Sequence, residues 1–352
     1  MAKLNTADAV KSLSRAVALD AREPLYRFYL ADALTLDKKS REAEAQLQEY
    51  LKLNPRDNDR VPMAKAALDI AIGFRGVEMG AIDAPPQPAP IKFQKFLNLL
   101  FMEASINGQG PFRFLIDTGA TQTVITEKVA ARLALKRIAT NVMHGVGGDG
   151  KLDSPIFRAD AFKIGDVTIK NLPLGTLSNP TLELVLDGII GTPMLADFIV
   201  TIDYPKAQLE LSRKAAEGGT VLPVWSFSGL LLTPVDVNGK HKGNFLVDTG
   251  ADSTLLAHSM ANNLGVNKNT PGAKVDLPIG GIGGLDNGLL MVPKVTLKTP
   301  VQSKDFDFLM ALELKDMSAL IQTELSGVLG YDSWKDYRLT LDYHKAEIRL
   351  SK

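Results

Sequence analysis

The chain has 352 residues, with 40 basic and 40 acidic side chains, 45% apolar residues and no cysteine. At about 100–200 residues per domain, this length predicts two or three domains. The balanced charge argues against a nucleic-acid binder, because a polyanion attracts a basic surface. No stretch approaches the roughly 20 consecutive apolar residues of a membrane-spanning helix. The lack of cysteine excludes disulfides, thiolate zinc sites, iron–sulfur clusters and a cysteine nucleophile.

Residues 1–82 have the pattern of a small helical domain. Apolar residues recur at helical spacing, residues 16–20 (AVALD) match residues 50–54 (YLKLN), and Pro24 and Pro55 mark helix boundaries. A period of about 34 residues with two helices per repeat is typical of tetratricopeptide repeats. Residues 23–56 therefore resemble one such repeat flanked by half-repeats. An ordinary amphipathic helical hairpin is the alternative.

The helix expected at residues 6–19 corresponds to the second helix of a repeat whose first helix is missing. We therefore expect native residues before residue 1. No apolar core follows Lys3, so we expect no signal peptide in this chain, and the compartment stays open between cytoplasm and periplasm. The helical domain is expected to bind a protein partner, to take part in assembly or to inhibit the rest of the chain.

Residues 83–92 are expected to form a proline-rich linker, after which short alternating runs and Asn-Gly turns predict β structure. The rest of the chain is an internal duplication. Residues 114–120 (FLIDTGA) correspond to 245–251 (FLVDTGA), 188–191 (GIIG) to 327–330 (GVLG), and 201–204 (TIDY) to 340–343 (TLDY). Matched blocks in the same order predict two homologous lobes, at residues 93–214 and 215–352. Each has a short helix after its Asp-Thr-Gly motif, expected at 126–135 and 257–264.

Asp-Thr-Gly-Ala at the end of an apolar strand, a glycine-rich flap and a Gly-aliphatic-aliphatic-Gly block are together typical of aspartic peptidases. Residues 93–352 resemble the retropepsin-like branch of that family, with both copies in one chain. The resemblance implies a mainly β fold, in which two homologous lobes form an aspartic-protease pseudo-dimer behind a small all-α domain. It also implies an aspartic endopeptidase that acts on peptide or protein substrates without a cofactor or metal. The flaps lack a tyrosine and no arginine follows Gly191 or Gly330, so bacterial relatives are the closer comparison.

Asp117 and Asp248, one in each lobe, are the expected catalytic residues. Two carboxylates about 3 Å apart cannot both ionise comfortably and share one proton, so that one serves as general base and the other as general acid. Gly119 and Gly250 lack a Cβ atom, which lets the two backbones approach. By resemblance, Thr118 and Thr249 form hydrogen bonds to the opposite lobe.

The substrate-binding flaps are expected at residues 144–151 and 279–286. Their contact residues would be Val146, Gly147 and Gly148 in the first flap and Ile282, Gly283 and Gly284 in the second. With Val146 and Ile282 as the apolar groups, we expect an extended substrate with apolar side chains beside the cut.

Residues 145–151 also fit the nucleotide-binding pattern G-x-x-x-x-G-K. However, Leu152 stands in place of the Ser or Thr that would hold magnesium, and Pro155 argues against a following helix. The four histidines have no metal-ligand spacing.

The rival function is a non-catalytic peptide-binding or adaptor protein that uses the protease-like cleft and the helical domain. Two intact Asp-Thr-Gly motifs favour the enzyme, since a binder has no need of two facing carboxylates. Because both aspartates lie on one chain, activity per chain is expected to be independent of concentration, and residues 93–352 are expected to suffice for catalysis.

Overall fold

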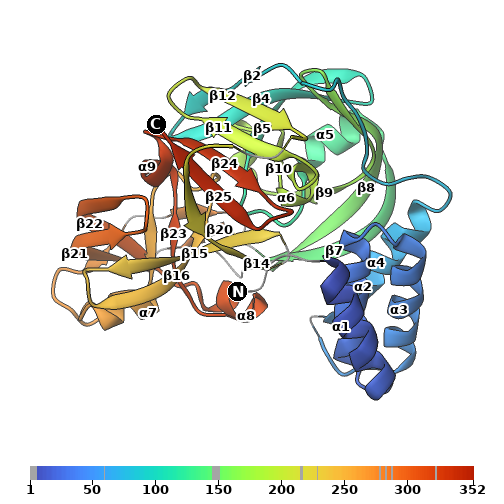
Figure 1. Cartoon of the computed structure of the whole chain (residues 1–352), viewed down its shortest axis with the longest axis horizontal. Helices are drawn as coiled ribbons and strands as arrows, with labels where there is room; N and C mark the ends of the chain where they lie inside the picture. Colours follow the sequence, from blue (N-terminus) through green and yellow to red (C-terminus); the bar gives the residue numbers. More distant parts are fainter. Residues whose placement is uncertain are drawn as a thin grey trace.

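The computed structural model describes residues 6–58, 60–144, 151–214, 217–227, 229–276, 279–281, 284–286, 288–321 and 323–352. A helical segment precedes two β lobes, as the sequence predicts (Figure 1). None of the helices in these ranges has the length and apolar character needed to cross a membrane.

The helical segment consists of α1 (Thr6–Leu19), α2 (Pro24–Leu36), α3 (Ser40–Lys52) and α4 (Arg60–Gly73). The Glu23 side chain caps α2 by accepting a hydrogen bond from the Leu25 amide at 3.0 Å, and Pro24 occupies the first turn, where a missing N–H is harmless. Consecutive helices pack side by side around Ala31, Leu47 and Ala64. The small side chains let the helix axes approach. Whether the segment is a tetratricopeptide repeat stays a prediction.

The first lobe consists mainly of strands, with a few short helices between them. In chain order they are β1 (Ala81–Asp83), β2 (Ile91–Lys92), β3 (Gln94–Phe96), β4 (Leu99–Ile106), β5 (Gln109–Ile116), β6 (Val124–Thr126), α5 (Glu127–Arg132), β7 (Lys136–His144), β8 (Lys151–Ile164), β9 (Val167–Leu177), the 3₁₀ turn η1 (Leu182–Leu184), β10 (Gly188–Ile190), α6 (Thr192–Leu195), β11 (Ile199–Asp203) and β12 (Gln208–Ser212).

The second lobe repeats this order. Its elements are β13 (Thr220–Pro223), β14 (Trp225–Phe227), β15 (Leu230–Val237), β16 (His241–Val247), β17 (Leu255–Ala257), α7 (His258–Asn263), β18 (Lys274–Val275), β19 (Ile279–Gly281), β20 (Gly284–Asp286), β21 (Leu289–Lys298), β22 (Ser303–Leu312), α8 (Lys315–Leu320), β23 (Leu325–Leu329), α9 (Tyr331–Trp334), β24 (Arg338–Asp342) and β25 (Glu347–Ser351).

The two lobes place the Asp-Thr-Gly motifs in the same way. In the first lobe, β10 lies between β5, to which it is parallel, and β6, to which it is antiparallel. In the second lobe, β23 lies between β16 and β17 with the same directions. Glycine is required at position 188 in β10, because an added Cβ atom would lie 2.3 Å from the Phe114 ring. The same holds for Gly327 in β23, where an added Cβ atom would lie 2.3 Å from the Phe245 ring. Asp117 and Asp248 follow directly after β5 and β16.

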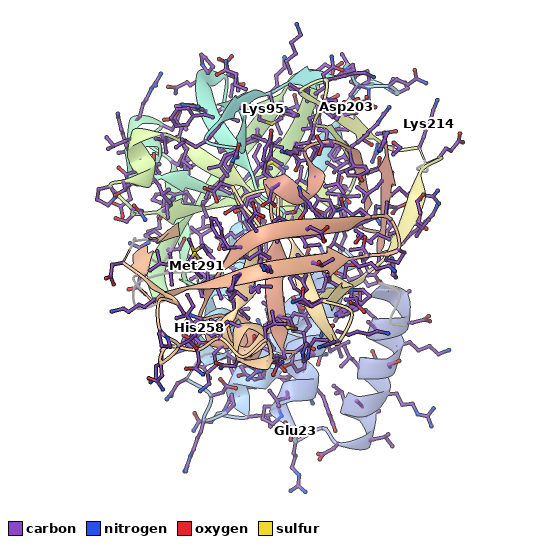
Figure 2. All side chains as sticks on the ribbon, turned by 90° about the vertical axis from the view of Figure 1, so that its left-hand side faces the viewer. Glu23, Lys95, Asp203, Lys214, His258 and Met291 are labelled. Atoms are coloured by element: carbon purple, nitrogen blue, oxygen red, sulfur yellow. The ribbon has the colours of Figure 1, made fainter. Side chains whose placement is uncertain are left out.

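A sheet shared by the lobes joins them, in the order β13-β25-β24-β11-β12-β2. At its centre β11 and β24 pair antiparallel, with Thr201 opposite Thr340 and their hydroxyl oxygens 3.0 Å apart. The chain interval between these threonines is 139 residues. They occupy the same position in the TIDY and TLDY blocks, so the pseudo-twofold axis passes between them. Lys95 and Asp203 lie at this end of the molecule, and Glu23 in the helical segment lies at the opposite end (Figure 2).

Local structure differs from the sequence expectation at a few ends. The helices α5 and α7 are shorter than the expected 126–135 and 257–264. The first ends because Ala134 takes a positive φ of 47°, and the second because Gly265 takes one of 81°. The ends of the proline-rich stretch 83–92 are in strands, since β1 pairs with β9 and β2 pairs with β12 of the first lobe.

The helical segment packs on the first lobe. Gly73 at the end of α4 lies against Ile138 of β7, where an added Cβ atom would be 3.2 Å from the isoleucine Cβ. Arg158 donates to the Gly73 carbonyl at 3.3 Å and places its guanidinium 5.3 Å from the centre of the Phe74 ring. Between α2 and α3, Lys38 forms an ion pair with Asp197 at 2.9 Å. These contacts hold the helices beside the β7–β8 hairpin.

Candidate active site

The structure brings Asp117 and Asp248 together from the two lobes. Each begins a tight turn after a central strand, because the Asp117 amide donates to the Ile190 carbonyl at 3.0 Å and the Asp248 amide to the Leu329 carbonyl at 3.1 Å. Within the turn, Oδ1 of Asp117 accepts from the Gly119 amide at 2.7 Å, and Oδ1 of Asp248 accepts from the Gly250 amide at 2.8 Å. The glycine amide of each motif thus orients the carboxylate of the same motif.

The glycine of each motif faces the aspartate of the other lobe. A Cβ atom on Gly119 would lie 2.6 Å from Oδ2 of Asp248, and one on Gly250 would lie 2.4 Å from Cγ of Asp117. Real Cβ atoms do not make contacts this short. The close approach of the two carboxylates therefore requires glycine at both positions.

The threonines of the two motifs bind each other across the lobe boundary. The Thr118 hydroxyl donates to the Val247 carbonyl at 2.7 Å, and the Thr249 hydroxyl donates to the Ile116 carbonyl at 2.9 Å. Both side chains are buried, with exposed fractions of 0% and 1%. These are the positions for which the resemblance implied hydrogen bonds to the opposite lobe.

Burial raises the pKa of both aspartates. For Asp117, the neighbouring charge of Asp248 and a hydrogen bond with it raise the pKa further, well above its usual range. For Asp248, the Gly250 amide and the hydrogen bond with Asp117 partly offset the effect of burial. The two groups titrate as a pair, and their raised pKa values favour one proton shared between them.

A further threonine in each lobe supports the turn, and sequence reasoning missed both. Thr123 accepts a hydrogen bond from the Gly191 amide at 3.1 Å, and Thr254 accepts one from the Gly330 amide at 3.2 Å. They occupy the same position in the duplicated blocks, which is the signal that would have found them. Among the described residues, Thr254 alone of the two has a carboxylate partner, because its amide and its hydroxyl both donate to Asp332. The corresponding position in the first lobe is Pro193, which has no carboxylate.

Two buried tyrosines lie near the aspartates. Tyr204 and Tyr343 end the duplicated TIDY and TLDY blocks, and burial raises the pKa of each phenol. The negative charge of Asp248 contributes to the shift at Tyr204, and that of Asp117 contributes at Tyr343. Each aspartate therefore disfavours ionisation of the tyrosine from the opposite lobe. The duplicated blocks can be seen in the sequence, but the proximity of their tyrosines to the two aspartates cannot.

The expected flap contacts lie mostly outside the described residues. This holds for Val146, Gly147, Gly148, Ile282 and Gly283. The strands on either side are present: β7 pairs with β8 up to His144 and Lys151, and Gly284 begins β20 opposite Gly281 of β19. A strand–strand hairpin here agrees with a flap and not with the strand-to-helix turn of a phosphate-binding loop.

Asn179 joins the second flap to the first lobe. Its Nδ2 donates to the Gly281 carbonyl at 3.3 Å, while its Oδ1 accepts from the Thr181 and Leu182 amides at 3.1 and 3.2 Å. Sequence reasoning gave no signal for this residue, because the contact joins segments far apart in the chain.

Apolar side chains surround the pair on both sides. Ala120 packs on a cluster in the first lobe, consisting of Phe101, Leu115, Val124, Leu177, Leu186 and Ile189. Ala251 packs on the corresponding cluster in the second lobe, which includes Leu230, Leu246, Leu289 and Val328. Within the described ranges, no group of three or more His, Asp or Glu side chains is placed to hold a metal ion.

Comparison of the sequence with known protein families agrees with this geometry. The sequence model for aspartyl proteases matches residues 102–194 and 233–332, which is more than half of the chain. A search of curated proteins finds no match. Among solved structures, the chain is similar to the aspartic proteinase from Irpex lacteus, with 11% identity and a TM-score of 0.47, over 77% of this chain and 97% of that chain. On the family match, which takes in both Asp-Thr-Gly motifs, the chain belongs to the aspartyl protease family.

Proposed function

We propose that the protein is an aspartic endopeptidase in which Asp117 and Asp248 together activate one water molecule. The observation that carries this proposal is the facing arrangement of the two carboxylates, each fixed by its own glycine amide and packed against the glycine of the other lobe. A pair with raised pKa values can hold one proton at pH values where an isolated aspartate has lost it.

In both steps of the proposed reaction, the pair gives one proton and takes one, so it holds a single proton throughout. The ionised carboxylate takes a proton from water as the water oxygen bonds to the peptide carbonyl carbon, while the protonated carboxyl gives its proton to the carbonyl oxygen. The tetrahedral diol then collapses: the carboxyl that now holds the proton from water gives it to the nitrogen, the other carboxylate takes a proton from one diol hydroxyl, and the C–N bond breaks. The products are a carboxylic acid and an amine, and the pair regains its proton.

The proposed substrate is an extended peptide with apolar side chains beside the cut. Partly buried apolar side chains that pack on the clusters beneath Ala120 and Ala251 support this preference, such as Leu182 in the first lobe and Met310 in the second. Apolar burial contributes roughly 25 cal/mol per Å², so two such side chains would give useful binding free energy. A mixture of peptides with charged residues at both positions should be cleaved slowly.

A digest of a defined peptide mixture in ¹⁸O-water tests the proposal. The wild type should release fragments with one ¹⁸O atom in each new carboxyl group, and Asp117→Asn and Asp248→Asn should release none while staying folded. Asp307→Asn is the matched control, because it makes the same chemical change at an exposed position of β22. Tight peptide binding without cleavage by the wild type would favour the adaptor alternative instead.

A further inference from the structure

A large cavity separates the helical segment from the two lobes. Its volume is about 1590 Å³, and its walls come from α2, α3 and α4 on one side and from both lobes on the other. The first lobe contributes Ile156, Leu172 and Met194, and the second contributes Phe227 and Ile321. In Figure 1, α8 and the helical segment lie at the bottom of the molecule, and the shared sheet with β11 and β24 lies at the top.

The cavity reaches the chain segment that follows the catalytic motif of the first lobe. Thr121, Gln122 and Thr123 line it, and they come directly after Ala120. Asp117 and Asp248 do not line it. The space is therefore a neighbour of the catalytic pair, continuous with the first lobe's active-site loop.

The size and chemistry of the cavity suit a polymer segment. Small-molecule pockets have volumes of roughly 300–1,000 Å³, and this cavity exceeds them. Its helical wall is mixed, with Phe28, Leu36 and Phe74 as apolar side chains beside several charged ones. An extended chain that emerges from the cleft beside Gln122 would meet this wall next.

One carboxylate stands in the middle of the apolar helix face. Asp32 lies on α2 one turn after Phe28 and one turn before Leu36, and all three line the cavity. Its side chain is accessible to solvent from the cavity, yet the surrounding protein raises the pKa of Asp32. In the described part of the chain, no basic group forms a salt bridge or hydrogen bond with it.

Other charges on the cavity wall are satisfied by partners. Lys38 pairs with Asp197 at 2.9 Å, and Arg60 pairs with Asp57 at 2.8 Å. Among the charged lining side chains of the described residues, those that form no salt bridge are the acidic Asp32, Glu42 and Asp316 and the basic Arg41. Over the described wall as a whole the charged side chains balance, because Lys38, Lys39, Arg41, Arg60 and Arg75 stand against Asp32, Glu42, Glu44, Asp197 and Asp316. The unpaired ones are mostly acidic, which favours a cationic ligand.

We infer that this cavity binds a second segment of the polypeptide substrate, and that Asp32 pairs with a lysine or arginine side chain of that segment. This inference rests on the proposed peptidase function and names the substrate more closely. The substrate is a long, unfolded polypeptide with apolar residues at the cut and one basic residue at a distance from it. A short peptide that fills only the cleft would lack this contact.

A set of peptides with one cleavage sequence tests the inference. The short peptide spans the cut alone, and the long ones carry a tail with either one lysine or one norleucine, moved along the tail position by position. We expect one lysine position to lower the KM of the wild type about fivefold to tenfold relative to norleucine, with kcat unchanged.

Variants of the helical segment locate the effect. Asp32→Asn should abolish the lysine preference while cleaving the short peptide normally, and Asp32→Lys should prefer glutamate at that position. Asp69→Asn is the matched control, because Asp69 is exposed on α4 and does not line the cavity. Equal KM values of wild type and Asp32→Asn for every tail would overturn the inference. An equal loss for lysine and norleucine tails would overturn it as well.

A binding assay separates this inference from the proposed function. Fluorescence anisotropy with the full-length Asp117→Asn chain measures binding of the same labelled tails without cleavage. Lysine-dependent binding that Asp32→Asn removes supports the inference even if the wild type cleaves nothing. Binding that ignores the tail contradicts it even if cleavage of the short peptide is efficient.

Discussion

The amide of Thr118 donates to the hydroxyl of Thr249 at 3.1 Å, and the amide of Thr249 donates to the hydroxyl of Thr118 at the same distance. Each hydroxyl in turn donates to a carbonyl of the opposite lobe. The four hydrogen bonds form a closed arrangement about the pseudo-twofold axis. Because Asp117 and Asp248 directly precede these threonines, the arrangement fixes the distance between the two carboxylates.

Removing one hydroxyl from this arrangement should damage both stability and activity. Thr118→Val leaves the Val247 carbonyl and the Thr249 amide buried without partners, at a cost of about 1–3 kcal/mol each. We expect a loss of about 2–4 kcal/mol in the free energy of unfolding and a large fall in kcat. Thr118→Ser keeps the hydroxyl and should restore most of both. Chemical denaturation and steady-state kinetics measure the two effects, and a fully active Thr118→Val protein would contradict this account.

A methyl group between the lobes should separate the aspartates. The Cβ atom of Gly250→Ala would lie 2.4 Å from Cγ of Asp117, so the carboxylate has to move. We expect cleavage to fall by at least two orders of magnitude, given the need for hydrogen-bond geometry in proton transfer. Gly327→Ala is the steric control, since its Cβ atom would meet the Phe245 ring at 2.3 Å, away from the pair. That variant should lose stability but keep the pH profile of its remaining activity.

Much of this site was predictable because the chain is duplicated. The repeated Asp-Thr-Gly blocks identify Asp117 and Asp248, and the repeated Gly-aliphatic-aliphatic-Gly blocks identify the strands beside them. What the sequence could not give are contacts between distant segments. Lys38 and Asp197 are 159 residues apart, and Asn179 and Gly281 are 102 residues apart, so neither pair has a periodic or motif signature. The short strands at the ends of the proline-rich stretch escaped prediction for the same reason.

The raised pKa values predict how activity depends on pH. The active form of the pair holds one proton, so kcat/KM should fall at low pH as the second carboxylate is protonated. It should fall again as pH rises through the raised pKa of the pair and the shared proton is lost. The alkaline fall should therefore lie above the usual range of an aspartate, about 3.9. Activity that keeps rising into the alkaline range would be inconsistent with a shared proton.

The same shift predicts the effect of pH on stability. A carboxyl whose pKa is higher in the folded than in the unfolded state binds more protons when folded, so stability is lost as pH rises from about 4 through the folded pKa. Asp117→Asn has no such proton to lose. We expect its free energy of unfolding to exceed that of the wild type at neutral pH, and this difference to shrink towards pH 4. Denaturation midpoints at both pH values check this, with the exposed Asp307→Asn as control. An Asp117→Asn protein that is less stable at neutral pH would refute the direction.

The central claim is that one chain forms one active site from both aspartates. The direct measurement is turnover per chain over a wide dilution range for the wild type, Asp117→Asn, Asp248→Asn and an equal mixture of the two variants. We predict constant turnover per chain for the wild type, because the two lobes share one covalent chain and one sheet, and no activity in either variant or in their mixture. Activity recovered by mixing, together with a steep loss of wild-type turnover on dilution, would show that the active site forms between two chains.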